Sequence, residues 1–130
     1  MDPRTIPHAP ADLLSELMTR ERLLHFPEPG VTRADLEAGM IEDYWEVGAS
    51  GGHFDIDVIW QVVRRRAEQD TVAPWRTEDE ECRLVAPDTY LLTYLLDQDG
   101  RRTRRSTIWR VQGGTWLAVY HQGTVVTGQW

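Results

Sequence analysis

Three residues of this sequence combine reactive side chains with settings that suit proton transfer. Glu46 follows the aromatic pair Tyr44 and Trp45. A carboxylate near aromatic side chains can have a raised pKa and remove a proton next to a carbonyl group. His121 carries an imidazole, which can give or take a proton at neutral pH. Arg105 can stabilise the negative charge that develops on an enolate, so these three residues, Glu46, Arg105 and His121, are the candidate catalytic residues.

Each candidate also has a structural interpretation. Glu46 can form an ion pair with Arg105, which would lower the pKa of its carboxyl group and make it a weaker base. Such a pair could still hold a carboxylate or hydroxyl ligand. His121 can be a buried histidine whose nitrogens bond to neighbouring hydroxyl groups. No Asp or Glu lies close enough to His121 in the sequence to orient it, so a Ser–His–acid triad is not supported.

Five further residues are candidates for contact with a ligand. The glycine-rich stretch 48–52 lacks the spacings and the lysine of phosphate-binding loops. It is typical of a tight turn, from which one serine hydroxyl could point into a pocket. The other four candidates are hydroxyl, amide or aromatic groups in late predicted strands. The five are Ser50, Tyr94, Ser106, Trp109 and Gln122.

Composition removes several classes of function. The 130 residues include 14 Lys+Arg against 21 Asp+Glu, and the net charge of −7 disfavours binding to nucleic acid or anionic lipid. Every basic residue is arginine, which excludes a Schiff-base or P-loop lysine. The single Cys82 excludes an internal disulfide, and His8, His25 and His53 form no metal-ligand spacing. We therefore expect no metal, no cofactor and no nucleic-acid partner.

The length predicts one domain preceded by a short arm. Residues 1–10 contain three prolines and are expected to be extended, and residues 11–130 are expected to form a single domain. The apolar stretches are too short to cross a membrane, and no hydrophobic region follows a basic start, so we expect no membrane span and no secretory signal. Together with the lone cysteine, this indicates a cytoplasmic location.

Three helices are predicted in the first half of the chain. Thr32 and Asp35 have the spacing of a capping box, and Asp55 is a typical helix cap. Between the second and third helices, the aromatic stretch 44–47 indicates a short strand. The predicted helices start near Pro10 or Ala11, at Thr32 and at Asp55, and they stop before Pro27, near Asp43 and near Arg66.

Beyond Arg66 the apolar periodicity changes from helical to two, which is typical of strands. Asp99-Gly100 and Gly113-Gly114 are dipeptides that form two-residue hairpin turns. Helices followed by an antiparallel meander predict an α+β fold. The later strands are expected near 72–77, 81–86, 89–97, 102–111 and 115–122.

Two-residue turns fix a register for the last three strands. Polar side chains would then form two rows across the sheet, Thr93–Ser106–His121 on one face and Tyr94–Arg105–Gln122 on the other. A bulge at either turn would exchange the faces. Both faces also carry apolar residues, so one face can cover the helices while the other needs a second cover, such as a partner subunit.

Three motifs resemble the DUF4440 branch of the nuclear-transport-factor-2-like superfamily, close to its SnoaL-like members. They are Glu46-Val-Gly-Ala-Ser-Gly, Arg105-Ser-Thr-Ile-Trp and Trp116…His121-Gln-Gly-Thr. The resemblance covers roughly residues 12–125 and implies a cone-shaped α+β barrel with a pocket at its open end. It also implies a homodimer through the outer sheet face. Fold resemblance fixes the architecture better than the activity.

The resemblance implies three alternative functions. The first is a small-molecule-binding domain whose pocket contains the residues named above. The second is a cofactor-independent isomerase, cyclase or dehydratase of ketosteroid-isomerase or SnoaL type, with Glu46 or His121 as acid or base. The third is a non-catalytic dimeric scaffold. An open pocket with a free carboxylate or imidazole would favour the enzyme, and the lack of a pocket would favour the scaffold.

Overall fold

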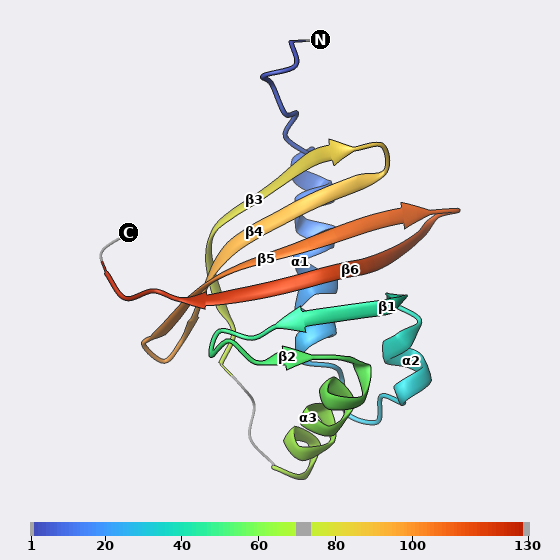
Figure 1. Ribbon diagram of the computed structural model, residues 1–130, viewed down its shortest axis with the longest axis vertical. Helices are drawn as coiled ribbons and strands as arrows, with labels where there is room; N and C mark the ends of the chain where they lie inside the picture. The colour runs from blue at the N-terminus through green and yellow to red at the C-terminus, as the bar shows by residue number, and fades with distance from the viewer. Residues whose placement is uncertain (1, 70–73, 129–130) are drawn as a thin grey trace.

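The computed structural model describes residues 2–69 and 74–128, and within them three helices pack on a curved six-stranded sheet (Figure 1). The helices are α1 (Ala11–His25), α2 (Arg33–Glu37) and α3 (Ile56–Glu68). The strands are β1 (Met40–Val47), β2 (His53–Phe54), β3 (Arg76–Ala86), β4 (Thr89–Gln98), β5 (Arg101–Gln112) and β6 (Thr115–Val125). The predicted α+β class is confirmed.

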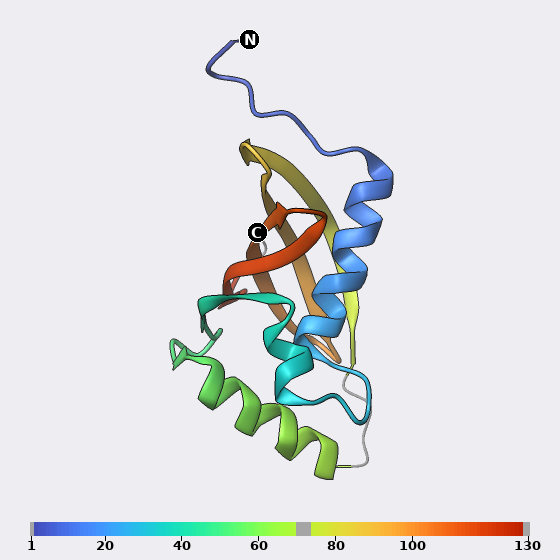
Figure 2. The same ribbon diagram turned by 90° about the vertical axis from the view of Figure 1, so that its right-hand side faces the viewer.

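The sheet has the strand order β2-β1-β6-β5-β4-β3, in which β1 and β6 run parallel and the other neighbours antiparallel. Figure 2 shows α1 lying along the concave side of the sheet, with α2 and α3 at one end of the resulting cone. The core fills the space between these layers. It includes Leu17 and Leu24 of α1, Leu92 of β4 and Trp109 of β5.

The start of α1 agrees with the prediction. Pro10 occupies the N-cap position and Ala11 begins the helix. A proline is tolerated at this end because the first backbone N–H groups of a helix have no partner within the helix. Leu17 and Leu24 face the sheet, and Glu21 lies between them on the same face. Helix α1 therefore carries a carboxylate into the core.

The second predicted helix is much shorter than expected. Its capping box is confirmed, since the Thr32 hydroxyl accepts from the Asp35 N–H and the Asp35 carboxylate accepts from the Thr32 N–H. The helix ends at Glu37, however, and the predicted extension to Asp43 is wrong. Residues 40–47 form β1 because they pair in parallel with β6, and this tertiary pairing overrides the local helical pattern.

Helix α3 agrees with the prediction at its start. The Asp55 carboxylate accepts a hydrogen bond from the Val58 N–H, and Ile59 and Val63 face inward. None of the helices in the described part of the chain is long and apolar enough to cross a membrane.

The two strands predicted before residue 87 are one strand. Strand β3 runs through Arg76–Ala86 with an irregularity between Glu78 and Glu81, where Asp79 adopts a positive φ of 54°. Residues 72 and 73 of the predicted strand lie outside the described residues. The N-terminal arm runs beside this strand, since the Ala9 N–H donates to the Cys82 carbonyl.

The register predicted for the first hairpin is confirmed. Tyr94 lies opposite Arg105 and Thr93 lies opposite Ser106. The second hairpin also starts as predicted at its Gly113-Gly114 turn. The register between β4 and β5 therefore follows from the turn dipeptide alone.

Further along the second hairpin, the predicted register is wrong by one residue. Val119 is an extra residue in β6, a β-bulge that shifts everything after it. His121 consequently lies opposite Thr107 and not opposite Ser106, and Gln122 lies opposite Ser106. The bulge lies within the strand, where no turn signal marks it. It moves His121 to the concave face and Gln122 to the outer face.

Candidate acid–base site

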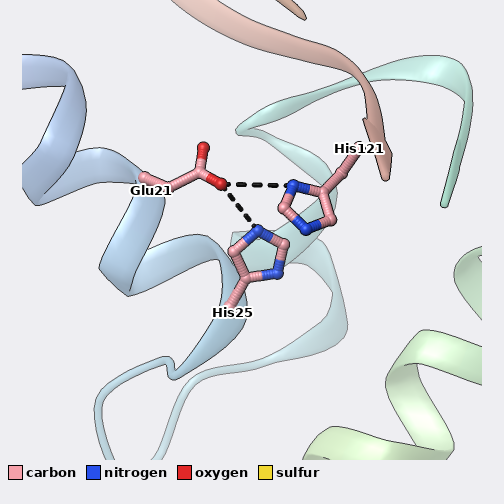
Figure 3. A group of neighbouring side chains, drawn as sticks. All are labelled: Glu21, His25 and His121. Atoms are coloured by element: carbon pink, nitrogen blue, oxygen red, sulfur yellow. Dashed lines mark hydrogen bonds and ion pairs between the residues drawn. The ribbon is translucent and has the colours of Figure 1, made fainter. Parts of the chain in front are cut away.

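Glu21 is the centre of a buried polar network on the concave face. Its side chain is fully buried, yet both carboxylate oxygens are hydrogen-bonded, as buried polar groups require. Figure 3 shows one carboxylate oxygen of Glu21 facing two neighbouring imidazole rings, those of His25 and His121. Oε1 accepts from Trp109 Nε1 at 3.0 Å, and Oε2 accepts from Tyr94 OH at 2.6 Å, Thr107 Oγ1 at 2.6 Å and His25 Nε2 at 2.9 Å.

These contacts keep Glu21 ionised. Burial on its own raises the pKa of the carboxyl group, because the charged form is poorly solvated. The charge of His25 and the hydrogen bonds from His121 and His25 outweigh that effect and hold the pKa of Glu21 well below its ordinary value. The core therefore contains a carboxylate anion at neutral pH.

The contacts of His121 define its tautomer. Its Nε2 lies 3.3 Å from Arg105 Nη1, and because guanidinium nitrogens only donate, Nε2 must accept. The ring proton is then on Nδ1, which lies 2.6 Å from Thr107 Oγ1 and 3.2 Å from Glu21 Oε2. Burial, followed by repulsion from His25, lowers the pKa of His121. His121 is therefore a neutral, internally bonded imidazole.

His25 differs from His121 because only one of its nitrogens is hydrogen-bonded. Nε2 donates to Glu21 Oε2 at 2.9 Å, one helical turn away on α1. In the neutral ring this bond leaves the Nδ1 lone pair free, and Nδ1 lies 3.6 Å from Glu46 Oε1. Once Nδ1 takes a proton, the ring carries the positive charge that lowers the pKa of Glu21 and of His121. The His25 side chain is 10% exposed and that of Glu46 is 17% exposed, so this edge of the network reaches the surface.

Glu46 does not form the ion pair proposed from the sequence. Among the described residues it has no arginine within ion-pair distance, and it accepts a hydrogen bond from Tyr44 OH at 2.6 Å. Burial, followed by the charge of Glu46, raises the pKa of Tyr44 well above its ordinary value, so the phenol stays protonated as the donor. Arg105 instead donates from Nε to Thr103 Oγ1 at 3.0 Å.

An aromatic wall flanks the exposed edge of the network. The ring of Trp75 stacks on His25 with centroids 6.5 Å apart and also lies 5.9 Å from Tyr94. Phe26 meets Trp75 edge-on at 5.4 Å. Arg105 is half-buried beside this edge, and burial lowers the pKa of its guanidinium group. This edge of the network therefore combines the imidazole of His25, the carboxylate of Glu46 and the guanidinium of Arg105 with the flat apolar surface of Trp75.

The structure brings together five of the eight residues singled out from the sequence. Three of them contact the Glu21 carboxylate directly, and the other two lie beside the imidazoles. These five are Glu46, Tyr94, Arg105, Trp109 and His121. The remaining three lie elsewhere: Ser50 in an exposed turn, and Ser106 and Gln122 on the outer face of the sheet. The predicted rows Thr93–Ser106–His121 and Tyr94–Arg105–Gln122 are both wrong at their third member because of the bulge at Val119.

Sequence reasoning missed Glu21, His25 and Thr107. Glu21 lies on the apolar face of α1, one turn after Leu17. A charged residue at such a position indicates a buried polar group, and this pattern could have identified Glu21. Glu21 and His25 also have the four-residue spacing that brings side chains together on a helix. Thr107 gave no local signal, since it joins the network only through the shifted register.

The same three groups have the donor types of a metal site. Glu21, His25 and His121 each offer one ligand atom, and these atoms lie within 4.8 Å of one another. A ligating His121 Nδ1 would have to lose its proton, whereas the contact between Arg105 and Nε2 requires that proton. The oxygens of Glu21 also already accept four hydrogen bonds. The arrangement fits acid–base chemistry better than metal binding.

Two cavities lie near the network. One, of about 730 Å³, is lined by Ser106 and Gln122 of the outer face and also by Tyr94 and Arg105, which belong to the network. The other, of about 1130 Å³, lies between α1 and α3. Glu21 and the two imidazoles line neither of these cavities, and the network reaches the surface at His25 and Glu46.

Solved structures share this fold. An NTF2-like protein of Pseudomonas aeruginosa matches with a TM-score of 0.64 and 13% identity over 88% of this chain and 96% of that one. A protein with a cystatin-like fold from Caulobacter vibrioides matches with a TM-score of 0.65 and 15% identity over 89% of each chain. An NTF2-like protein of Silicibacter pomeroyi matches with a TM-score of 0.60 and 19% identity over 89% of this chain and 94% of that one.

The chain has the nuclear-transport-factor-2-like fold, as the motifs implied. No family model and no curated protein matches the sequence. Assignment to the DUF4440 branch therefore stays a prediction from the motifs. Because the proteins of known structure share few identical residues with this chain, they establish its fold and leave its activity to be argued from the site.

Proposed function

We propose that this chain binds a small organic molecule at the exposed edge of the interior network and that His25 moves a proton on it. The observation that carries this proposal is the 2.9 Å hydrogen bond between His25 Nε2 and Glu21 Oε2. It fixes the proton on Nε2 and leaves Nδ1, at the edge beside Glu46, as a base. Neither Glu46 nor His121 has this arrangement, although the sequence favoured them.

The neighbours of His25 have distinct roles in this proposal. Glu21 holds the imidazole in one tautomer and stabilises the imidazolium that forms when Nδ1 takes a proton. Arg105 lies at the same edge and can stabilise the oxygen of an enolate as charge develops there. His121 is a positioning residue, since its Nε2 accepts from Arg105. These roles suit removal of a proton next to a carbonyl, as in an isomerase, cyclase or dehydratase.

Deuterium exchange tests the proton-transfer step. Cyclic ketones and β-keto acids in heavy water would be followed by NMR for loss of the proton next to the carbonyl. We expect exchange that His25→Gln abolishes and that Glu21→Gln slows roughly 100-fold or more, because the tautomer is no longer fixed. His53→Gln is the matched control, since His53 is an exposed histidine on β2. Exchange that survives His25→Gln would contradict the assignment.

Binding without chemistry is the second candidate function. The observation that favours it is that Glu21 and His121 are both fully hydrogen-bonded in the buried network. A native mass spectrum, followed by a denatured one, would weigh any small molecule released by the purified protein. A bound molecule with no catalysed exchange would support a binding domain. A protein with neither would support the scaffold.

We also propose that a second copy covers the outer face of the sheet. Trp45 is 38% exposed there and lies 4.8 Å from the ring of Tyr120, which pairs with Ile108. An aromatic patch of this kind is typical of an interface. Light scattering after size-exclusion chromatography should give a dimer that Trp45→Glu converts to a monomer. A monomeric wild-type protein would contradict the proposal.

A further inference from the structure

The cavity between α1 and α3 is a separate groove on the opposite side of α1 from Glu21. Helical periodicity places Thr19, Leu23 and Phe26 on the face that lines it, whereas Glu21 and His25 face the sheet. The groove has a volume of about 1130 Å³, slightly above the roughly 300–1,000 Å³ of small-molecule sites. The space is therefore sufficient for a chain-like ligand.

The floor of this groove is apolar and uncovered. Phe26 and Trp60 are half-buried, and Val63 lies at its base. Leu23 is 42% exposed, which makes it one of the few large apolar side chains of the described chain that face solvent. A contiguous apolar surface of this kind is typical of a binding site.

The charges that line the groove are unusual for this acidic protein. Arg22, Arg64 and Arg66 contribute to the lining. Among the described residues, no ion pair involves any of the three. Arg66 donates to the His25 carbonyl at 2.6 Å and lies over the Phe26 ring, whereas Arg22 and Arg64 have no such contact. Glu28 and Glu68 also line the groove, so the lining carries three cations and two anions.

We propose that this groove binds an amphiphilic carboxylate, such as a medium-chain fatty acid. The hydrocarbon chain would cover the floor formed by Leu23, Phe26 and Trp60, where burial of apolar surface is the driving force. The carboxylate would pair with Arg22 and Arg64, whose guanidinium groups match carboxylate geometry. The proposal does not require proton transfer, since it uses neither Glu21 nor the His25 side chain. Phe26 borders both sites.

Isothermal titration with decanoate, below the concentration at which it forms micelles, tests this proposal. We expect one molecule to bind per chain, with quenching or shift of the tryptophan fluorescence because Trp60 lines the groove. Decyltrimethylammonium, with the same chain length and opposite charge, should bind at least tenfold more weakly. Equal binding of the two amphiphiles, or no binding of decanoate, would overturn the proposal.

Neighbouring arginines on α3 supply the matched variants. Arg64→Gln removes a charge that lines the groove and should weaken decanoate binding about tenfold. Arg65→Gln removes the same charge one residue away, outside the lining, and should leave the affinity unchanged. Both positions are exposed near the end of the helix, so both variants should fold. Equal effects of the two variants would overturn the assignment of Arg64.

Discussion

The two faces of the sheet carry similar polar side chains in very different settings. On the outer face, Thr93, Ser106 and Gln122 form a row across three strands beside an open cavity. On the concave face, the hydroxyl and imidazole of Thr107 and His121 meet the carboxylate of helix α1 in the core. The outer-face side chains are exposed or half-buried, whereas each concave-face group is buried and depends on its protein partner. A row of polar side chains on the sheet is therefore not enough to form a site. The buried network forms only where helix α1 brings the Glu21 carboxylate against the concave face.

The largest effect should come from Trp109, which is 2% exposed on the concave face and donates to Glu21. Trp109→Ala should lower the free energy of unfolding by about 3–5 kcal/mol, because it leaves a cavity. Urea denaturation would measure this loss. Trp109→Phe is the control, since it keeps most of the ring volume and removes the donor. A loss below about 1 kcal/mol for the alanine variant would show that the two faces do not differ as described.

The second-largest effect should come from Glu21→Gln, which should lower the free energy of unfolding by about 3 kcal/mol. The amide keeps the shape of the side chain but turns an NH₂ group toward donors such as Tyr94 and Trp109. Glu16→Gln makes the same change on the exposed side of α1 and serves as the control. If both variants were as stable as the wild type, the carboxylate could not be the centre of the network.

The concave face should also make stability depend on pH. Burial and repulsion from His25 lower the pKa of His121 below its ordinary 6.5. As the pH falls, the imidazole of His121 is therefore protonated in the unfolded chain at a higher pH than in the folded chain. The free energy of unfolding should therefore fall as the pH drops from about 6.5 through the folded pKa of His121. The pKa of Glu21 in the folded chain is held below its ordinary 4.5. Ionised Glu21 therefore adds its full contribution to the free energy of unfolding above pH 4.5, and this contribution is lost as the pH falls through the pKa of Glu21 in the folded chain.

Urea denaturation at intervals from about pH 8 to pH 4 would follow this dependence. His121→Gln should remove the decline that begins near pH 6.5 and leave the later one. His53→Gln, at an exposed histidine, should change neither. A free energy of unfolding that stays constant from about pH 7 to pH 5 would contradict the buried, neutral state of His121.

The smallest effect should come from the outer face. Ser106→Ala and Gln122→Ala should each change the free energy of unfolding by no more than about 0.5 kcal/mol, because neither side chain bonds to a group of the buried network. Urea denaturation beside the Glu21→Gln variant makes the comparison direct. A loss above about 1 kcal/mol for either residue would mean that the outer row is a second buried network.

Much of the fold followed from local signals in the sequence. The Thr32–Asp35 capping box, the Asp55 cap and the two hairpin turns all formed as predicted, since each depends on a few neighbouring residues. The conversion of residues 40–43 from predicted helix to strand did not follow, because it depends on parallel pairing with β6. That pairing joins residues far apart in the chain, where a local pattern carries no information.

The site was predicted only in part for the same reason. Tyr94 and Arg105 were placed on one face because the first hairpin fixes their register. His121 was placed on the opposite face from them, since the bulge at Val119 has no signal in the sequence. Glu21 and His25 come from a helix more than eighty residues earlier, and only the packing of α1 against the sheet brings them to His121.

Nitrogen NMR of the imidazole rings would show whether Glu21 orients His25 and His121. In uniformly labelled protein, the shifts of the ring nitrogens report which one carries the proton. We expect neutral His25 to carry its proton on Nε2 and none on Nδ1, and His121 to carry its proton on Nδ1 and to titrate below 6.5. A proton on Nδ1 of neutral His25, or titration of His121 at or above 6.5, would show that Glu21 does not orient the imidazoles as described.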